Sequence, residues 1–251
     1  MDSASTPSRR LMTIEIVSFP GAGDRRQRGW LAQPEHAGPA PGVLVIHEIL
    51  GLVENQKPVL ERFAAEGFVA LAPDLFDRPG ARPLCVVRTL NDLRCGEGGA
   101  LDDLRAAMGF LRAHPRVAGD RLGVAGFCMG GGFALLMALE PGVGAVAPFY
   151  GTSPAYLDRV AESCPVVASF GDRDLVFRRS AERLRTALER AGVEHDFRSY
   201  PDAGHSFMTG DLPGVTGKLG AIGPLRVGYR REAAEDSWRR MLDFFRRFVR
   251  V

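Results

Sequence analysis

Short apolar runs alternate with longer amphipathic stretches along most of this chain. Each run is rich in β-forming residues, is bounded by Gly or Pro, and is too short for an independent helix, so it predicts a strand. The predicted strands are GVLVIHE (42–48), GFVALAPD (67–74), DRLGVAGF (120–127), GVGAVAPFY (142–150), CPVVASFG (164–171) and HDFRSY (195–200).

Between these runs, apolar residues recur at the spacing of a helix that packs one face on a sheet. The predicted helices cover residues 55–67, 99–115, 177–192 and 231–251. Near the amino end, two short runs (13–19 and 28–34) flank a turn, which predicts an antiparallel start. The whole pattern predicts an α/β fold, in which a mostly parallel central sheet is flanked by helices on both faces.

Two segments break this rhythm, at 77–99 and 209–230, and the second is rich in glycine. Irregular segments of this length often cover functional sites, so we expect both to be loops over the site. No repeat or linker-like stretch divides the chain, so we expect residues 1–251 to form one domain, with 1–11 as a flexible tail.

Composition narrows the classes of function. Thirty-two basic side chains nearly balance thirty acidic ones, and no basic block predicts a nucleic-acid partner. No apolar segment resembles a signal peptide or a membrane span, so we expect no membrane association and a cytoplasmic location. The four cysteines and five histidines lack the spacing of a metal site, so we expect reduced thiols and no metal.

The most specific motif is GFCMGGG at residues 126–132, between a predicted strand and the helix-like FALLMALE. It matches G-x-nucleophile-x-G, the strand-turn-helix elbow of α/β-hydrolases, with cysteine in place of serine. The positive end of a helix stabilises a thiolate, which favours Cys128 as the nucleophile. The alternative is a buried, inert cysteine in a glycine-rich turn.

An acid and a base follow in the order that this fold requires. GDRD (171–174) comes after one predicted strand, and PDAGHSF (201–207) comes after the next. His205 would accept the proton of Cys128, while Asp174 would orient the imidazole and stabilise its charged form.

Other readings of these loops remain open from the residues alone. Asp172 is the nearest competitor of Asp174 for the role of the acid, and Asp202 could brace the turn before His205. Taken singly, the GDRD loop could be a solvated turn, and His205 could be a structural histidine.

With these motifs, the chain closely resembles the dienelactone hydrolase family over nearly all of residues 12–249. HEILG (47–51) and PDLF (73–76) are similar to further segments of that family. The resemblance implies that Glu48 helps to generate the thiolate when substrate binds, and a carboxyl group with a raised pKa could accept that proton. Alternatively, Glu48 caps a loop through backbone N–H groups.

The resemblance also implies where substrate is held. The oxyanion hole would consist of the backbone N–H groups of Met129 and Ile49. Dienelactone-cleaving members bind the substrate carboxylate with arginines, but one of those positions is Thr209 here. The second carboxylate-binding arginine would lie within 77–99. In the second loop, Lys218, Arg226 and Arg230 are possible substitutes for the arginine that Thr209 replaces. The candidate substrate contacts are Arg82, Arg88, Phe76 and Phe207.

These features predict a cysteine hydrolase that cleaves a small activated ester or lactone through an acyl-enzyme and needs no cofactor. Thiolate is a good leaving group, so activated substrates such as enol lactones or aryl esters are favoured. One alternative is a noncatalytic ligand-binding or redox-responsive protein with a reactive Cys128. Another is an acyltransferase that uses the same triad. The sequence leaves the oligomeric state and the physiological substrate open.

Overall fold

An eight-stranded sheet runs through the molecule in the order β1-β2-β4-β3-β5-β6-β7-β8. The computed structural model describes residues 14–23, 25–209 and 220–249. The strands are β1 (Ile14–Pro20), β2 (Arg26–Ala32), β3 (Gly42–Ile46), β4 (Val69–Pro73), β5 (Leu122–Phe127), β6 (Val143–Phe149), β7 (Val166–Gly171) and β8 (His195–Tyr200). β3 through β8 each lie within a predicted run, whereas β1 is shifted by one residue and β2 by two from the predicted 13–19 and 28–34, so all eight strands are confirmed with small shifts at the amino end.

The sheet is mostly parallel, as predicted. β1 pairs with β2 and β2 with β4 in antiparallel register, whereas all pairs from β4 through β8 are parallel. β3, β4, β5 and β6 are buried along their whole length because helices cover both faces. Parallel strands end at the same edge, so the loops after β3, β5, β6, β7 and β8 meet there.

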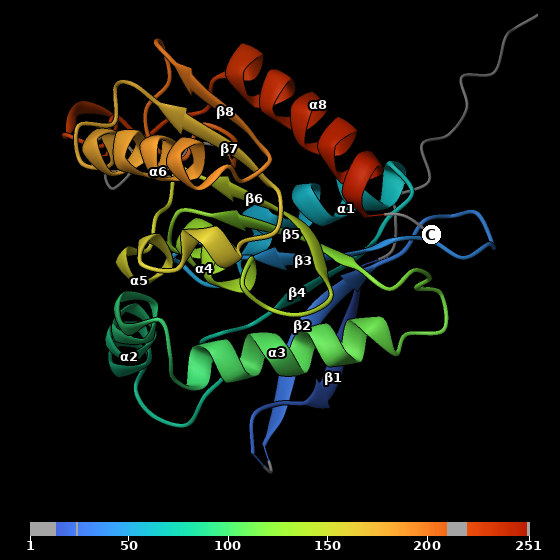
Figure 1. Ribbon diagram of the computed structural model, residues 1–251. Coiled ribbons are helices and arrows are strands. Elements are labelled where there is room, and N and C mark those ends of the chain that lie inside the picture. The colour runs from blue at the N-terminus through green and yellow to red at the C-terminus, as the bar shows by residue number, and fades with distance from the viewer. Residues whose placement is uncertain (1–13, 24, 210–219, 250–251) are drawn as a thin grey trace, which may run out of the picture.

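Helices form a layer on each side of the sheet (Figure 1). α1 and α8 lie on one side, and α3 and α4 lie on the other. The helices are α1 (Lys57–Ala65), α2 (Arg82–Cys95), α3 (Gly99–Arg112), α4 (Met129–Met137), α5 (Pro154–Leu157), α6 (Arg178–Ala191) and α8 (Arg231–Phe248), with short 3-10 turns η1 (Glu54–Gln56) and η2 (Val160–Glu162). The predicted mixed α/β fold is therefore confirmed.

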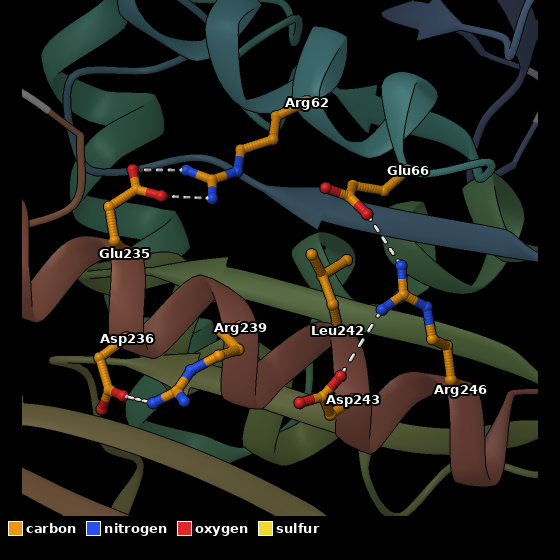
Figure 2. A pocket seen from close by; sticks show the side chains of 8 residues that line it. All are labelled: Arg62, Glu66, Glu235, Asp236, Arg239, Leu242, Asp243 and Arg246. Carbon is orange, nitrogen blue, oxygen red and sulfur yellow. Dashed lines mark hydrogen bonds and ion pairs between the residues drawn. The ribbon is translucent and has the colours of Figure 1, made fainter.

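α1 and α8 are joined by buried rings and by surface charges. Phe63 and Trp238 pack edge to face with ring centroids 4.9 Å apart, and the guanidinium of Arg62 lies 4.6 Å from the Trp238 ring. Figure 2 shows the polar groove between the two helices, where Arg62 donates two hydrogen bonds to Glu235. The groove holds about 500 Å³, and ion pairs within and between the two helices occupy its walls.

The prediction that residues 77–99 form a loop is wrong. α2 occupies Arg82–Cys95, beginning with a proline in its first turn and ending at Gly96, which has φ +76°. Both residues are standard boundary signals of a helix. Only Cys85 and Thr89 of this helix are buried, so its apolar residues do not form one buried face and the helical periodicity is weak.

The second predicted loop is only partly within the described residues. Residues 220–222 are helical, and 223–230 have no regular secondary structure. Leu225 and Gly228 form backbone hydrogen bonds with His205, so this stretch lies directly against the histidine loop. Lys218 and the predicted tail at 1–11 lie outside the described residues. Within the described ranges, no helix has the length and apolar character needed to cross a membrane.

Candidate active site

Cys128 lies in a sharp turn between β5 and α4. Its backbone has φ 54° and ψ −117°, a strained conformation for a residue with a side chain. A Cβ atom on Gly126 would lie 2.0 Å from the carbonyl oxygen of Gly130, and one on Gly130 would lie 2.2 Å from that of Ile46. The turn is therefore possible only with glycine at both positions, as the elbow motif requires.

His205 and Asp174 come together at the carboxyl edge of the sheet. Asp174 Oδ2 accepts a hydrogen bond of 2.6 Å from His205 Nδ1, and both side chains are almost fully buried. Asp174 Oδ1 accepts backbone N–H bonds of 3.0 Å from Val176 and Phe177. These bonds orient the carboxylate, which in turn orients the imidazole.

The two competing aspartates have other positions. Asp172 is only half-buried, and its backbone N–H bonds the carbonyl oxygen of Tyr200. Asp202 is exposed, and its carbonyl oxygen accepts a bond from Arg230. Among the described aspartates, only Asp174 bonds the histidine ring.

The environment of His205 favours its charged form. Burial by itself lowers the pKa of His205, but hydrogen bonds to Asp174 and Cys128, together with attraction to both charges, raise it to about 10. The ring is enclosed by Phe177, stacked at 5.0 Å, and Tyr150, tilted at 5.1 Å. An imidazolium beside the sulfur would stabilise a thiolate.

Glu48 is a second buried ionisable group at this edge. Its Oε1 accepts hydrogen bonds of 3.0 Å from Ser206 Oγ and 3.0 Å from Thr209 Oγ1. Burial raises the pKa of Glu48, while the two hydroxyl groups, His205 and Tyr150 partly oppose that shift. Thr209 therefore contacts Glu48 in the position where the family resemblance implied an arginine.

The two expected oxyanion donors are backbone groups at the starts of α4 and of the loop after β3. Among the described residues, neither the Met129 N–H nor the Ile49 N–H donates to a protein acceptor. Met129 is the first residue of α4, where N–H groups have no partner within the helix. No protein acceptor among the described residues therefore competes with a ligand for either group.

The candidate substrate contacts have different surroundings. Arg82, at the start of α2, donates to the Leu50 carbonyl oxygen and lies 5.7 Å from the ring centre of Phe76. Arg88 is exposed farther along α2. Phe207 is fully buried and packs on Tyr150 and other core rings, so its side chain belongs to the core.

The remaining arginines of the 77–99 segment are engaged elsewhere. Arg78 Nε donates to Asp103 at 2.7 Å, and Arg94 donates to Asn91 at 3.1 Å. Arg82 forms no ion pair with any of the described carboxylates. Its bond to the Leu50 carbonyl oxygen instead places it beside the loop that carries Glu48.

Sequence reasoning named Thr209 only as the place of a missing arginine, and it predicted none of Ser206, Thr209 and Tyr150 as neighbours of Glu48. Ser206 and Thr209 follow β8, and Tyr150 follows β6, with its hydroxyl 3.4 Å from Thr209 Oγ1. Burial raises the pKa of Tyr150 well above its usual range, so the phenol is neutral. Polar residues directly after parallel strands are a detectable signal because those strand ends meet at one edge.

Comparison with known proteins identifies the family. Residues 27–249 match the model of the dienelactone hydrolase family. The chain belongs to the dienelactone hydrolase family. A Methylorubrum extorquens protein named "Putative carboxymethylenebutenolidase" is 32% identical over 238 residues, covering 86% of this chain and 75% of the relative.

Solved structures agree with this family membership. A crystal structure of a Klebsiella pneumoniae protein named "Putative Dienelactone Hydrolase" has a TM-score of 0.78 at 26% identity, covering 94% of this chain and 99% of that one. A dienelactone hydrolase-like promiscuous phosphotriesterase from metagenomic libraries has a TM-score of 0.77 at 25% identity, with 95% and 99% covered. The resemblance predicted from the motifs is confirmed, and the chain is a carboxymethylenebutenolidase-like hydrolase.

Proposed function

We propose that this dienelactone hydrolase family member cleaves a small activated ester or lactone through Cys128, His205 and Asp174. The observation that carries the proposal is the 2.6 Å bond between His205 and Asp174, with the same imidazole interacting with Cys128 in the strained elbow. A nucleophile, a base and an orienting acid in this chain order are the parts of a nucleophilic triad.

In the first half of the reaction, the Cys128 thiolate attacks the carbonyl carbon of the substrate. The N–H groups of Met129 and Ile49 stabilise the resulting oxyanion, and a single such donor is worth about 10²- to 10³-fold in kcat. The His205 imidazolium then donates its proton to the leaving oxygen. The carbon–oxygen bond breaks, and an acyl-enzyme remains on Cys128.

In the second half, the neutral His205 removes a proton from water as the water attacks the thioester. The tetrahedral intermediate collapses, the carbon–sulfur bond breaks and the acid leaves. Cys128 is again a thiolate, and His205 is again protonated. Asp174 stabilises the imidazolium in both halves, since its carboxylate stays bonded to Nδ1.

We propose that Glu48 exchanges a proton with the site before chemistry. Its raised pKa and its position beside His205 support this role. Among the described contacts, its Oε1 is bonded to Ser206 and Thr209 rather than to Cys128, so proton uptake from the thiol requires movement of one side chain.

For the substrate, we propose a small molecule with either a neutral or an anionic acyl group. Thr209 offers no charge, which favours a neutral group beside Glu48. Arg82 offers a cation beside the loop after β3, which favours an anionic group there. An Arg82→Gln variant separates these classes because only an anionic substrate loses a charged partner and shows a raised KM.

The testing experiment follows turnover of an activated aryl ester and of a dienelactone by the wild type, Cys128→Ala and Cys128→Ser. Mass spectrometry of the quenched wild-type reaction looks for an acyl adduct on Cys128. Turnover with the adduct, reduced at least about 10³-fold in Cys128→Ala, is the expected result.

Other outcomes identify the alternatives. Adduct formation whose acyl group passes to an added alcohol instead of water would indicate an acyltransferase. Oxidation or binding at Cys128 with no turnover of either substrate would refute hydrolysis and indicate a noncatalytic protein.

A further inference from the structure

His47 is a buried polar residue that the triad does not use. It directly follows β3, and its side chain is fully buried. Its Nε2 accepts a hydrogen bond of 3.1 Å from the Leu75 N–H, and its Nδ1 lies 2.7 Å from the Glu48 carbonyl oxygen. Because Nε2 is an acceptor, the proton is on Nδ1, which donates to Glu48.

The surroundings of His47 maintain this neutral tautomer. Burial lowers the pKa of His47, and Arg82 acts in the same direction, while the backbone bond to Glu48 and the charge of Asp74 oppose them. Asp74 Oδ1 is 3.8 Å from Nε2, beyond hydrogen-bond distance, and it accepts the Phe76 N–H instead. One donor and one acceptor thus satisfy both ring nitrogens.

The bond to Glu48 determines the direction of the next N–H group. The carbonyl oxygen of Glu48 and the N–H of Ile49 belong to one peptide unit, which is planar and trans, so they point in opposite directions. That oxygen accepts from His47 Nδ1 and also from the Gly51 N–H at 2.9 Å. Because the Glu48 carbonyl oxygen is held toward His47, the Ile49 N–H points away from His47. Among the described residues, this N–H has no protein acceptor.

His47 also ties this peptide to the neighbouring strand. Leu75 lies just beyond β4, which pairs with β3 in parallel register. The imidazole therefore bridges the ends of two strands at the edge where Cys128 lies. The turn bond from Gly51 is local, whereas the bridge through His47 connects the peptide to the core of the sheet.

We infer that His47 is a positioning residue for the oxyanion hole: it fixes the Glu48–Ile49 peptide so that the Ile49 N–H faces the reacting carbonyl oxygen. This inference rests on the proposed function, because it assigns a role in stabilising the oxyanion of that reaction. Among the described hydrogen bonds, the His47 ring bonds Glu48 and Leu75 and not Cys128.

The test uses two variants that each keep one half of the bridge. In His47→Asn, the side-chain amide lies near the place of Nδ1 and can still donate to Glu48. In His47→Gln, it lies near the place of Nε2 and can bond only Leu75. We expect the kcat of His47→Gln for an activated aryl ester to fall by about 10²-fold, which is the effect of losing one oxyanion donor. His47→Asn should retain most of the wild-type kcat.

Two further measurements exclude a merely structural effect. Affinity for a trifluoromethyl ketone, which forms an oxyanion on attack by the thiolate, should fall in parallel with kcat in His47→Gln. The rate of Cys128 alkylation by iodoacetamide, which involves no oxyanion, and the KM for the ester should be unchanged.

Three results would overturn the inference. They are equal kcat values in both variants, alkylation that falls together with turnover, and wild-type ketone affinity in His47→Gln. Absence of ester turnover in the wild type would instead refute the proposed function, and the inference with it, so the two failures are distinguishable.

Discussion

Glu48 keeps an ionisable carboxyl group in an almost closed environment. Its known partners are neutral hydroxyl groups from Ser206 and Thr209, and His205 is the nearby group that can carry a positive charge. A buried carboxylate without a direct ion pair is costly, which is why burial raises its pKa. Such residues are common at functional sites, where stability and activity have opposing demands.

The Glu48→Gln variant tests whether Glu48 lowers stability while it supports activity. The folded pKa of Glu48 lies above its usual 4.5, so the carboxylate destabilises the folded state increasingly as pH rises above 4.5. Glutamine keeps an acceptor oxygen and removes the charge, so the unfolding midpoint at pH 7 should rise while kcat falls by about 10²-fold. The exposed Glu15→Gln is the control, and a lowered midpoint in Glu48→Gln would contradict the argument.

His205 produces a pH dependence of the same sign, but over a higher pH range. Its folded pKa of about 10 exceeds its usual value of 6.5, so its contribution to stability is complete below pH 6.5 and is lost as pH rises to about 10. We expect the free energy of unfolding, measured in urea across this range, to decrease with pH. Asp174→Asn removes a major cause of the raised His205 pKa and should flatten the dependence of stability on pH. An equally steep dependence in this variant would argue against the His205–Asp174 pair as its cause.

At the scale of elements, the site depends on how closely the end of β5 approaches the start of α4 in the elbow. A Cβ atom on Gly126 would meet the backbone of Gly130, which cannot move like a flexible side chain. A Cβ atom on the exposed Gly109 of α3 would meet nothing within 4 Å. These two glycines therefore form a matched pair for substitution.

Gly126→Ala should lower the free energy of unfolding by at least about 3 kcal/mol because the end of β5 and the start of α4 must separate. Gly109→Ala should raise it by about 0.5–1 kcal/mol because alanine restricts the unfolded chain and favours helix. Chemical denaturation of both variants measures the difference. Equal effects of the two substitutions would show that the elbow is not sterically constrained.

At the scale of the whole molecule, α1 and α8 close one face of the sheet through apolar burial more than through their ion pairs. Trp238 is 3% exposed and contacts the Phe63 ring, whereas the Arg62–Glu235 pair lies at the surface of the groove in Figure 2. Surface ion pairs contribute little because water and salt screen them.

Trp238→Ala should therefore destabilise the protein by about 3–5 kcal/mol, and Glu235→Gln by less than about 1 kcal/mol. Thermal and urea unfolding at low and high salt measure both. The Glu235→Gln effect should shrink at high salt, whereas the Trp238→Ala effect should remain. A larger loss in Glu235→Gln than in Trp238→Ala would reverse this ranking.

Local patterns along the chain were enough to predict the strands, most of the helices and the location of the candidate nucleophile. Alternation and helical spacing are local properties, so they are visible without knowledge of distant residues. The elbow is also local, because strand, turn and helix are contiguous around Cys128. α2 was missed because few of its residues are buried, although Pro83 and Gly96 marked its ends.

Which polar groups meet became apparent only in the folded chain. Glu48 and Thr209 are 161 positions apart, and His205 and Asp174 are 31 apart, yet each pair is in hydrogen-bond contact. No periodicity encodes such pairs, because they arise where separate parallel strands end at one edge. The choice of Asp174 over Asp172, and the bridge through His47, followed from the direction of side chains and peptide planes, which is a property of the folded chain.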